Sequence, residues 1–289
     1  MIPAQFEYHA PTSIAEALRL LRTYGSDARL LAGGHSLLPM MKFRLATPAH
    51  LIDLGRIAGL RAITAEGGQV AIGAMTTHWM IESSALLRQK VPLLPETAAT
   101  IGDLQVRNAG TIGGSLAHAD PAADYPAAIL VLEAEMVAEG AGGRRTIAAT
   151  DFFTGLYGTA LGPDEILVEV RVPALAPRTG TAYLKFPHPA SGFAVVGVAA
   201  LVTLDAKGRC ERARIGVTGV APVAYRARAV EDRLSEQPLT AEKVAAAAEG
   251  ASDGVDANAD IFASAEYRRH LAIVFTKRAV QKALQQAQG

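Results

Sequence analysis

The stretch LAGGHSL, Leu31 to Leu37, follows a short apolar run at residues 28–31 and leads into a second apolar segment. Gly33 and Gly34 have no Cβ atoms, so a turn at this point can adopt positive φ and let an anion approach the main chain. Successive backbone amides and the Ser36 hydroxyl can then bind that anion. The stretch therefore predicts a phosphate-binding turn at the end of a strand.

A second stretch of matching chemistry, GTIGGS, runs from Gly110 to Ser115 and again places paired glycines before a hydroxyl side chain. Two such turns in one chain suggest one ligand with two adjacent phosphates, bound from both sides. Paired glycines also occur in ordinary tight turns, and these residues alone leave that alternative open.

The standard nucleotide-binding motifs are not matched. A Rossmann site needs G-x-G-x-x-G between a strand and a helix, with an acidic residue about 20 positions later. Gly33 and Gly34 lack the third glycine, although Asp53 stands near the expected offset. The chain contains no G-K-S or G-K-T, which excludes a Walker P-loop. A nucleotide would have to be bound in another way.

The composition indicates a folded chain of about two domains, because 289 residues with 50% hydrophobic and 19% charged side chains can bury a substantial core. Lys plus Arg equals Asp plus Glu at 28 each, so no positive excess points to nucleic acid or an anionic membrane. No stretch approaches the roughly 20 apolar residues of a membrane span, and no signal peptide is evident. We expect no nucleic-acid partner and no integral membrane segment.

Cys210 is the single cysteine. One thiol excludes an internal disulfide, and it also excludes an iron–sulfur cluster or a thiolate zinc site built from this chain alone. The cysteine usage is typical of a reducing compartment, and we predict a cytoplasmic protein.

The order of elements predicts a β-α-β unit followed by a mixed region and then a separate C-terminal region. Apolar patterns and turn residues place the first region within residues 7–54 and a hairpin at 61–74. Further strands are expected at 135–138, 144–147 and 166–172, and helices at 93–101 and 125–132. Residues 173–180 form the best linker candidate. Beyond it we expect a three-stranded meander at 181–186, 193–204 and 212–220, then helices at 226–234, 240–250 and 264–286.

Several polar residues allow more than one role. His35 and His118 lie near the two glycine stretches, but no further ligands at metal-site spacing accompany them, so hydrogen-bonded loop positions are favoured. Asp120 and Asp124 could form an acid/base pair, or cap the following helix. Lys185 in a predicted strand would either face an anion or point to water. Ser36 does not have the context of a nucleophile elbow.

Two long runs of sequence resemble the motifs of a known protein family. AGGHSLLPMMKFRLATPAHLIDL, from Ala32 to Leu54, and VRNAGTIGGSLAHADPAADYPAAILVLEA, from Val106 to Ala134, are similar to the two FAD-binding motifs of the medium subunit of molybdenum hydroxylases. Within this xanthine oxidase family, the chain most resembles the carbon monoxide dehydrogenase medium-subunit type, from end to end.

The resemblance implies an α+β fold with a two-lobed FAD-binding domain of the vanillyl-alcohol-oxidase/MurB (PCMH) type. This domain would span residues 1–176, with lobes at about 1–55 and 56–176. A smaller C-terminal α+β domain, residues 177–289, would carry the three-stranded antiparallel sheet and the terminal helices.

The resemblance also implies a set of FAD contacts. The two glycine stretches would surround the pyrophosphate, and Asp124 would hydrogen-bond the flavin. Leu167 would contact the adenine or dimethylbenzene side, and Lys185 would place its charge beside the isoalloxazine, where it could stabilise an anionic reduced flavin. The full expected set is Leu31, Ala32, Gly33, Gly34, His35, Ser36, Leu37, Ile101, Gly102, Gly110, Thr111, Ile112, Gly113, Gly114, Ser115, Asp124, Leu167, Lys185 and Phe193.

Two positions depart from the family pattern. Ser115 stands where the second motif usually has asparagine, which keeps a hydrogen-bonding side chain of shorter reach. Phe193 stands where carbon monoxide dehydrogenases have a tyrosine near the flavin, so the hydroxyl contact is lost. This second departure weakens the case for carbon monoxide as the substrate.

The implied function is electron transfer. FAD in this chain would accept electrons from two [2Fe-2S] clusters of a small subunit and pass them to an external acceptor. A large molybdopterin subunit would oxidise the substrate, and the whole would be a dimer of heterotrimers. No catalytic side chain and no metal site is expected in this chain. The alternatives are a self-contained FAD-dependent oxidoreductase and a non-enzymatic FAD or nucleotide-binding regulator. The substrate stays open among carbon monoxide, an aldehyde, a purine and an N-heterocycle.

Overall fold

The computed structural model describes all 289 residues. Its N-terminal lobe is a parallel sheet in the order β1-β3-β2, formed by Glu7–His9, His50–Asp53 and Ala28–Leu31. Helix α1, Ile14–Tyr24, packs against this sheet through four buried aliphatic side chains. The helix begins where the Ser13 hydroxyl accepts the amide of Glu16, which satisfies one of its free N–H groups. The expected β-α-β unit is therefore present.

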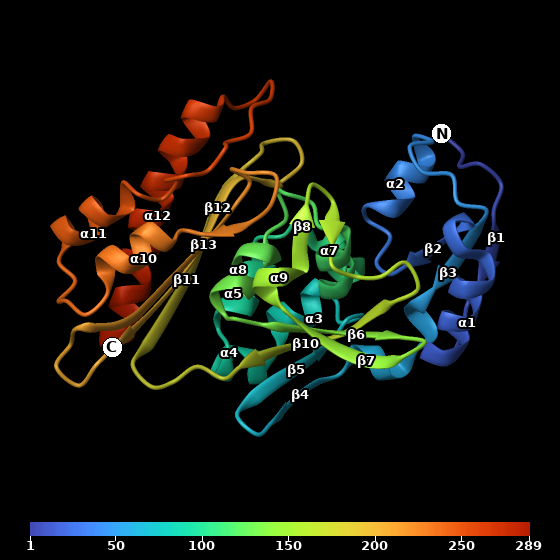
Figure 1. Cartoon of the computed structure of the whole chain (residues 1–289), viewed down its shortest axis with the longest axis horizontal. Helices are drawn as coiled ribbons and strands as arrows, with labels where there is room; N and C mark the ends of the chain where they lie inside the picture. The colour runs from blue at the N-terminus through green and yellow to red at the C-terminus, as the bar shows by residue number, and fades with distance from the viewer.

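The second lobe is a five-stranded antiparallel sheet with a layer of helices against it (Figure 1). The strand order is β4-β5-β10-β6-β7. The strands are β4 Ile63–Glu66, β5 Gln69–Gly73, β6 Glu135–Gly140, β7 Gly143–Ala148 and β10 Ile166–Pro173. The helices are α2 Leu37–Lys42, which precedes this lobe, then α3 His78–Ser83, α4 Ala85–Lys90, α5 Leu93–Ala99, α6 Leu104–Ala109, α7 Ile112–His118, α8 Tyr125–Val131 and α9 Ala149–Phe152.

The C-terminal region is a four-stranded antiparallel sheet in the order β11-β12-β13-β14. Its strands are β11 Thr179–Pro187, β12 Ala194–Leu204, β13 Cys210–Thr218 and β14 Tyr225–Arg226, and its helices are α10 Arg228–Leu234, α11 Ala241–Ala248 and α12 Ala265–Gln288. The remaining short elements are the hairpin of β8 Phe153–Gly155 and β9 Gly158–Thr159 and three 3-10 turns at Gly25–Asp27, Leu54–Arg56 and Ala58–Arg61.

Helices cover both faces of this last sheet, which explains why nearly every residue of β12 is buried. Two glycines permit the close approach. A Cβ at Gly180 would lie 1.9 Å from the Ala283 carbonyl oxygen of α12, and one at Gly216 would lie 2.3 Å from the Ala127 carbonyl oxygen of α8. Because α8 belongs to the second lobe, the largest core cluster continues from that lobe into β11 and β12.

The structure differs from the sequence-based expectations at several places, and helices α4 and α9 and the hairpin of β8 and β9 are among the elements that were not expected. The second glycine stretch is the beginning of α7, not a turn. Residues 104–109 form helix α6, which was not expected. A two-residue strand, β14, extends the predicted three-stranded sheet. β11 begins within the predicted linker, so the link shortens to 174–178, where we propose the domain boundary. No helix is both long and apolar enough to cross a membrane.

Candidate functional site

The two glycine stretches lie against each other, although about 80 residues separate them. A Cβ at Gly33 would lie 2.4 Å from the Ala109 carbonyl oxygen and 2.6 Å from Gly110 Cα. A Cβ at Gly114 would lie 3.3 Å from the Ala32 Cβ. Because backbone atoms cannot rotate away, only glycine at position 33 permits this contact. The fold thus places both stretches around one location.

The first stretch offers a row of free donors. The backbone amides of residues 33–37 donate to no other protein group, and the Ser36 side chain makes no capping hydrogen bond to α2. Gly34 has a φ of 76°, a left-handed conformation that glycine adopts without strain. Successive unpaired amides of this kind form an anion-binding concavity. The expected phosphate-binding turn therefore fits the structure.

The second stretch contributes differently from the expectation. Its amides at 112–115 all have protein acceptors: the carbonyls of Thr76, Ala74 and Thr111, and the Thr111 hydroxyl, which accepts from Gly114 N at 3.1 Å. Neither Gly113 nor Gly114 has positive φ. The interpretation of this stretch as a second cradle of free amides is wrong. Because Gly110 and Gly114 carry no side chain, the first stretch can approach the backbone of the second stretch closely.

Lys185 and Asp124 form a buried ion pair, with Nζ 3.1 Å from Asp124 Oδ2 and each side chain about 5% exposed. Lys185 Nζ also donates to the Thr100 carbonyl at 2.6 Å and the Gly192 carbonyl at 2.8 Å, which uses all three of its N–H groups. Tyr183 donates its hydroxyl proton to Asp124 Oδ1 at 2.5 Å. The alternative in which Lys185 points to water is therefore wrong.

The same contacts overturn the capping role of Asp124. It occupies the position before α8, but its side chain accepts from Tyr183 and Lys185 and makes no capping bond. Burial raises the pKa of Asp124, while the charge of Lys185 and the two hydrogen bonds oppose that rise. Burial and the Asp124 charge raise the pKa of Tyr183 well above its ordinary value, so Tyr183 stays a donor.

The ion pair anchors the loop between β11 and β12 to the second lobe. Lys185 holds the carbonyl of Gly192, and a Cβ at Gly192 would lie 3.7 Å from Gly102 Cα. The next residue, Phe193, is 42% exposed. The loop that carries this aromatic ring is thus positioned beside residues 101–102, which precede the second glycine stretch.

The other polar residues that the sequence analysis considered make hydrogen bonds or pack against an aromatic ring. His35 is exposed, with Nε2 3.3 Å from the Gln105 carbonyl oxygen. His118 ends α7, not a loop, and its ring centroid lies 5.2 Å from that of Tyr157. Asp120 accepts the Ala122 amide at 2.8 Å, so it caps a turn. These contacts support the hydrogen-bonded or packed roles and bring no further metal ligand to either histidine.

Three of the expected apolar residues lie beside the first stretch or in the core. A Cβ at Gly34 would lie 3.4 Å from Leu31 Cδ1, so Leu31 flanks the turn. Ile101 packs in part against the largest core. Leu167 is 5% exposed and lies within that core, where its side chain packs between strands and helices.

His78 and Arg107 are neighbours of the site that the sequence analysis did not select. His78 is buried, its amide donates to the Gly110 carbonyl at 2.9 Å, and a Cβ at Gly110 would lie 2.6 Å from its Nε2. Burial, with smaller contributions from His35 and Arg107, lowers the pKa of His78 to about 4. Arg107 pairs with Glu82 at 2.8 Å. The only sequence signal for His78 is that it follows Thr77, which caps α3.

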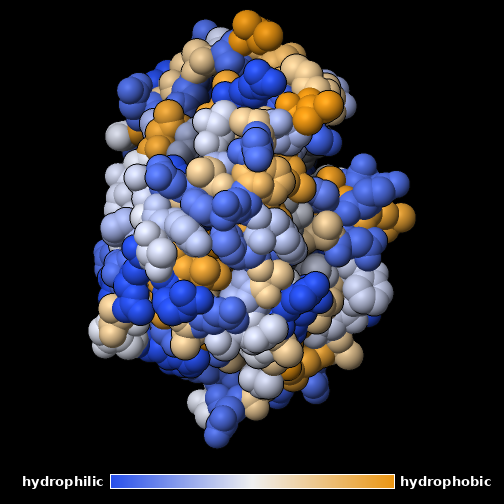
Figure 2. All heavy atoms as spheres, turned by 90° about the vertical axis from the view of Figure 1, so that its right-hand side faces the viewer, coloured by the Kyte–Doolittle hydropathy of each residue, from blue (hydrophilic) through white to orange (hydrophobic).

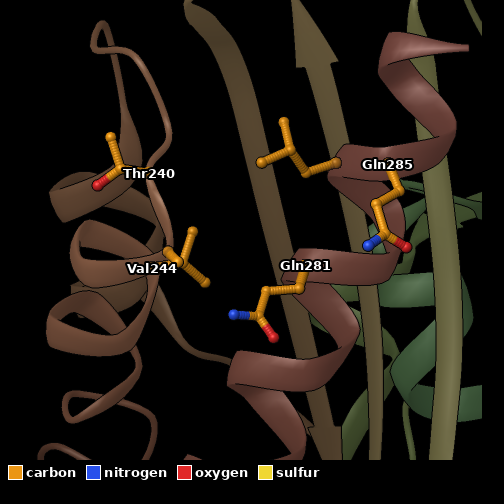
Figure 3. A pocket seen from close by; sticks show the side chains of 6 residues that line it. Thr240, Val244, Gln281 and Gln285 are labelled. Atoms are coloured by element: carbon orange, nitrogen blue, oxygen red, sulfur yellow. The ribbon is translucent and has the colours of Figure 1, made fainter.

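A cavity of about 310 Å³ lies away from the glycine stretches, between α11 and α12. Thr240 and Val244 line it from one helix and Gln281 and Gln285 from the other, as Figure 3 shows. The lining contains no titratable side chain, and its one hydroxyl, that of Thr240, accepts the amide of Lys243 as a helix cap.

Two family models together cover most of the chain. Residues 4–175 match the FAD binding domain in molybdopterin dehydrogenase, and residues 181–283 match the CO dehydrogenase flavoprotein C-terminal domain. The free amides of 33–37 and the glycine contacts fit a diphosphate of the kind FAD contains. The fold and site therefore define a flavoprotein subunit of an oxidoreductase, with FAD as its cofactor.

Similar proteins of known identity support the same class of protein. The chain is 47% identical to the carbon monoxide dehydrogenase medium chain of Hydrogenophaga pseudoflava over 98% of both chains. It is 39% identical to the 6-hydroxypseudooxynicotine dehydrogenase complex subunit alpha of Paenarthrobacter nicotinovorans, over 99% of this chain and 97% of that one. A solved structure of quinoline 2-oxidoreductase from Pseudomonas putida 86 matches with a TM-score of 0.95 at 36% identity, over the whole of both chains. The chain belongs to the family of FAD-binding medium subunits of molybdenum hydroxylases.

Proposed function

We propose that this chain carries FAD as the electron-transfer subunit of a molybdenum hydroxylase complex, accepting electrons from [2Fe-2S] clusters of a small subunit and passing them to an external acceptor. When bound, FAD supplies a centre that exchanges electrons singly or in pairs. The observation that carries the proposal is the contact between the two glycine stretches beside five free amides. It provides a site at which backbone groups can hold a cofactor.

In this proposal the chain's own residues hold and orient the cofactor. The amides of 33–37 bind the pyrophosphate, and the glycines of the second stretch let it lie close to the backbone. Lys185 and Asp124 fix the loop that carries Phe193, and this loop and the charged pair would lie near the flavin part of a bound FAD. The proposed contacts are the same nineteen residues, from Leu31 to Phe193, that the resemblance implies.

The partners follow from what this chain does not contain. Its single cysteine is buried in the C-terminal core, and burial raises its pKa to about 11, so it supplies no cluster ligand. The clusters and the molybdenum centre therefore belong to other subunits in the proposed assembly. We place one small and one large subunit with each copy of this chain, in a cytoplasmic dimer of such heterotrimers.

The substrate of the complex is assigned to the large subunit. The relatives named above act, by their names, on carbon monoxide, 6-hydroxypseudooxynicotine and quinoline. Solved structures of the carbon monoxide dehydrogenase from Hydrogenophaga pseudoflava and of quinoline 2-oxidoreductase superpose on this chain with TM-scores of 0.96 and 0.95. Since one medium-subunit fold serves such different substrates, substrate choice is proposed to lie elsewhere.

A reduction experiment tests the function. The assembled complex is mixed without oxygen with candidate substrates, and the visible absorbance of flavin and clusters is followed. We expect substrate to reduce the flavin in the complex but not in the isolated chain. In a complex depleted of FAD, substrate should still reduce the clusters while electron delivery to the acceptor stops.

The alternative, a self-contained FAD-dependent oxidoreductase, predicts the opposite pattern. The isolated chain would then be reduced directly by a small substrate, and it would pass the electrons to an acceptor without any other subunit. Either result would contradict an electron-transfer role.

A further inference from the structure

Three potential metal ligands meet on the outer sheet of the N-terminal lobe, away from the glycine stretches. Glu7 and His9 are two positions apart on β1, so their side chains point to the same face. His50 on the neighbouring strand β3 pairs in register with Glu7, which brings its imidazole to that face as well. The strands thus collect one carboxylate and two imidazoles at one location.

The separations between these groups are those of ligands around a shared ion. His9 Nε2 lies 3.2 Å from His50 Nδ1, and Glu7 Oε2 lies 3.5 Å from the same nitrogen. All three ligand atoms lie within 4.8 Å of one another. A tetrahedral Zn²⁺ with bonds of about 2.0–2.1 Å requires neighbouring ligand atoms to be about 3.3 Å apart. Small side-chain adjustments would satisfy that geometry.

A hydrogen bond between the two histidines would account for two of the three groups and leave Glu7 unexplained. One proton can join His9 to His50, but the 3.5 Å contact of Glu7 is too long for a good hydrogen bond. A cation would satisfy all three groups together, because neutral imidazole nitrogen and carboxylate oxygen are both good ligands for zinc.

Tyr24 from α1 holds the imidazoles in place. Its ring stacks on His50 with centroids 3.6 Å apart and lies 5.1 Å from the His9 ring. Stacking restrains the planes of both rings and leaves their nitrogen-bearing edges free. The side of the molecule that Figure 2 shows mixes hydrophilic and hydrophobic residues, and the Glu7 side chain is 73% exposed, so a hydrated ion can reach the site.

We propose that Glu7, His9 and His50 form a binding site for a divalent transition metal of the zinc class, with water as the fourth ligand. The ion would join β1, a strand of only three residues, to β3. This would tie the start of the chain to the lobe that carries the first glycine stretch. The proposal does not depend on the function of the bound FAD.

Zinc binding by the full chain tests the proposal. The protein is prepared without an affinity tag, stripped with a chelator, and dialysed against buffered Zn²⁺. Metal and flavin are then measured separately. We expect about one zinc ion per wild-type chain, held by three protein ligands. His9→Gln and His50→Gln should weaken binding more than about tenfold, since loss of even an outer partner of a ligand costs that much.

His270→Gln is the matched control, because His270 is exposed on α12 and has no such neighbours. It should bind zinc as the wild type does, and all variants should retain FAD. The zinc absorption-edge spectrum of the wild type should show nitrogen and oxygen ligands that are lost in the double variant, which combines His9→Gln with His50→Gln. The proposal is overturned if the wild type binds no more zinc than the double variant, or if His270→Gln loses the metal equally.

Discussion

Gly33→Ala tests most directly whether the contact between the two glycine stretches holds the cofactor. The new methyl group would lie 2.4 Å from the Ala109 carbonyl oxygen, where ordinary contacts begin at 3.4 Å. The stretches must therefore separate by about 1 Å, because their backbones cannot rotate away. Gly110 is held on both sides, since its amide bonds the Val106 carbonyl and its carbonyl accepts from His78.

The packing around Gly33 sets the size of the expected loss in FAD affinity. Forcing an extra methyl into a closely packed contact costs about 1–3 kcal/mol, and a backbone neighbour favours the upper end. The free protein can relieve the strain by letting the stretches move apart, whereas the bound form needs both against the pyrophosphate. The strain of the added methyl group therefore reduces the free energy of FAD binding. A reduction of about 3 kcal/mol corresponds to a loss of roughly a hundredfold in FAD affinity.

The assay is the ratio of flavin to chain after gel filtration, followed by titration of the stripped protein with FAD using flavin fluorescence. Gly59→Ala is the control, since a Cβ there meets no atom within 4 Å and the residue does not have positive φ. Its Kd should equal that of the wild type. A folded Gly33→Ala variant with the wild-type Kd would refute the assignment of this contact to the cofactor.

Three further predictions concern buried groups near the site. Lys185→Met should lower the free energy of unfolding at neutral pH by about 3 kcal/mol, because it leaves Asp124 buried without its partner. The penalty should shrink as the pH falls toward the raised pKa of Asp124, since a protonated carboxyl carries no buried charge. The pKa of His78 is lowered to about 4, so the wild type should lose about 3 kcal/mol of stability as the pH falls from 6.5 to 4, where the unfolded chain takes up the proton first. Thr111→Ala should cost about 1 kcal/mol by removing the cap on Gly114 N.

Urea unfolding at several pH values measures all three, and conservative variants serve as controls. Lys185→Met combined with Asp124→Asn should recover part of the stability that the single change loses. His78→Gln should flatten the pH dependence between 6.5 and 4, and an unchanged slope would show that His78 is not responsible. Thr111→Ser should keep the cap, so equal losses from serine and alanine would exclude the capping hydroxyl as the cause.

Local sequence patterns predicted much of the fold. The hairpin expected at 61–74 and the apolar strand expected at 193–204 correspond to β4–β5 and to β12 within a few residues of their expected bounds. The second glycine stretch was misread because a diglycine is as compatible with the first turn of a helix as with a tight turn once Thr111 caps it. Capping hydroxyls are common in sequences, and only the packing of Gly113 against Ala74 shows which one starts a helix.

The candidate site could be predicted only in part. The two glycine stretches were visible in the sequence, because close backbone approach demands glycine. The ion pair between Lys185 and Asp124 was not predicted, because 61 positions separate them and a lysine in a strand is compatible with water or with a buried partner. His78 and Arg107 were missed for the same reason, since their burial beside Gly110 depends on how α3 and α6 pack.

By itself, the sequence determined that the chain carries two glycine stretches and a single thiol, and it predicted that both stretches would admit a phosphate. Tertiary structure decided which of their amides are free to bind a ligand. Those of residues 33–37 find no protein acceptor, whereas those of 112–115 are all used. The physical reason is that an amide's availability depends on the acceptors that distant segments bring to it, and hydrogen bonding within a folded chain is settled only when the whole chain has packed.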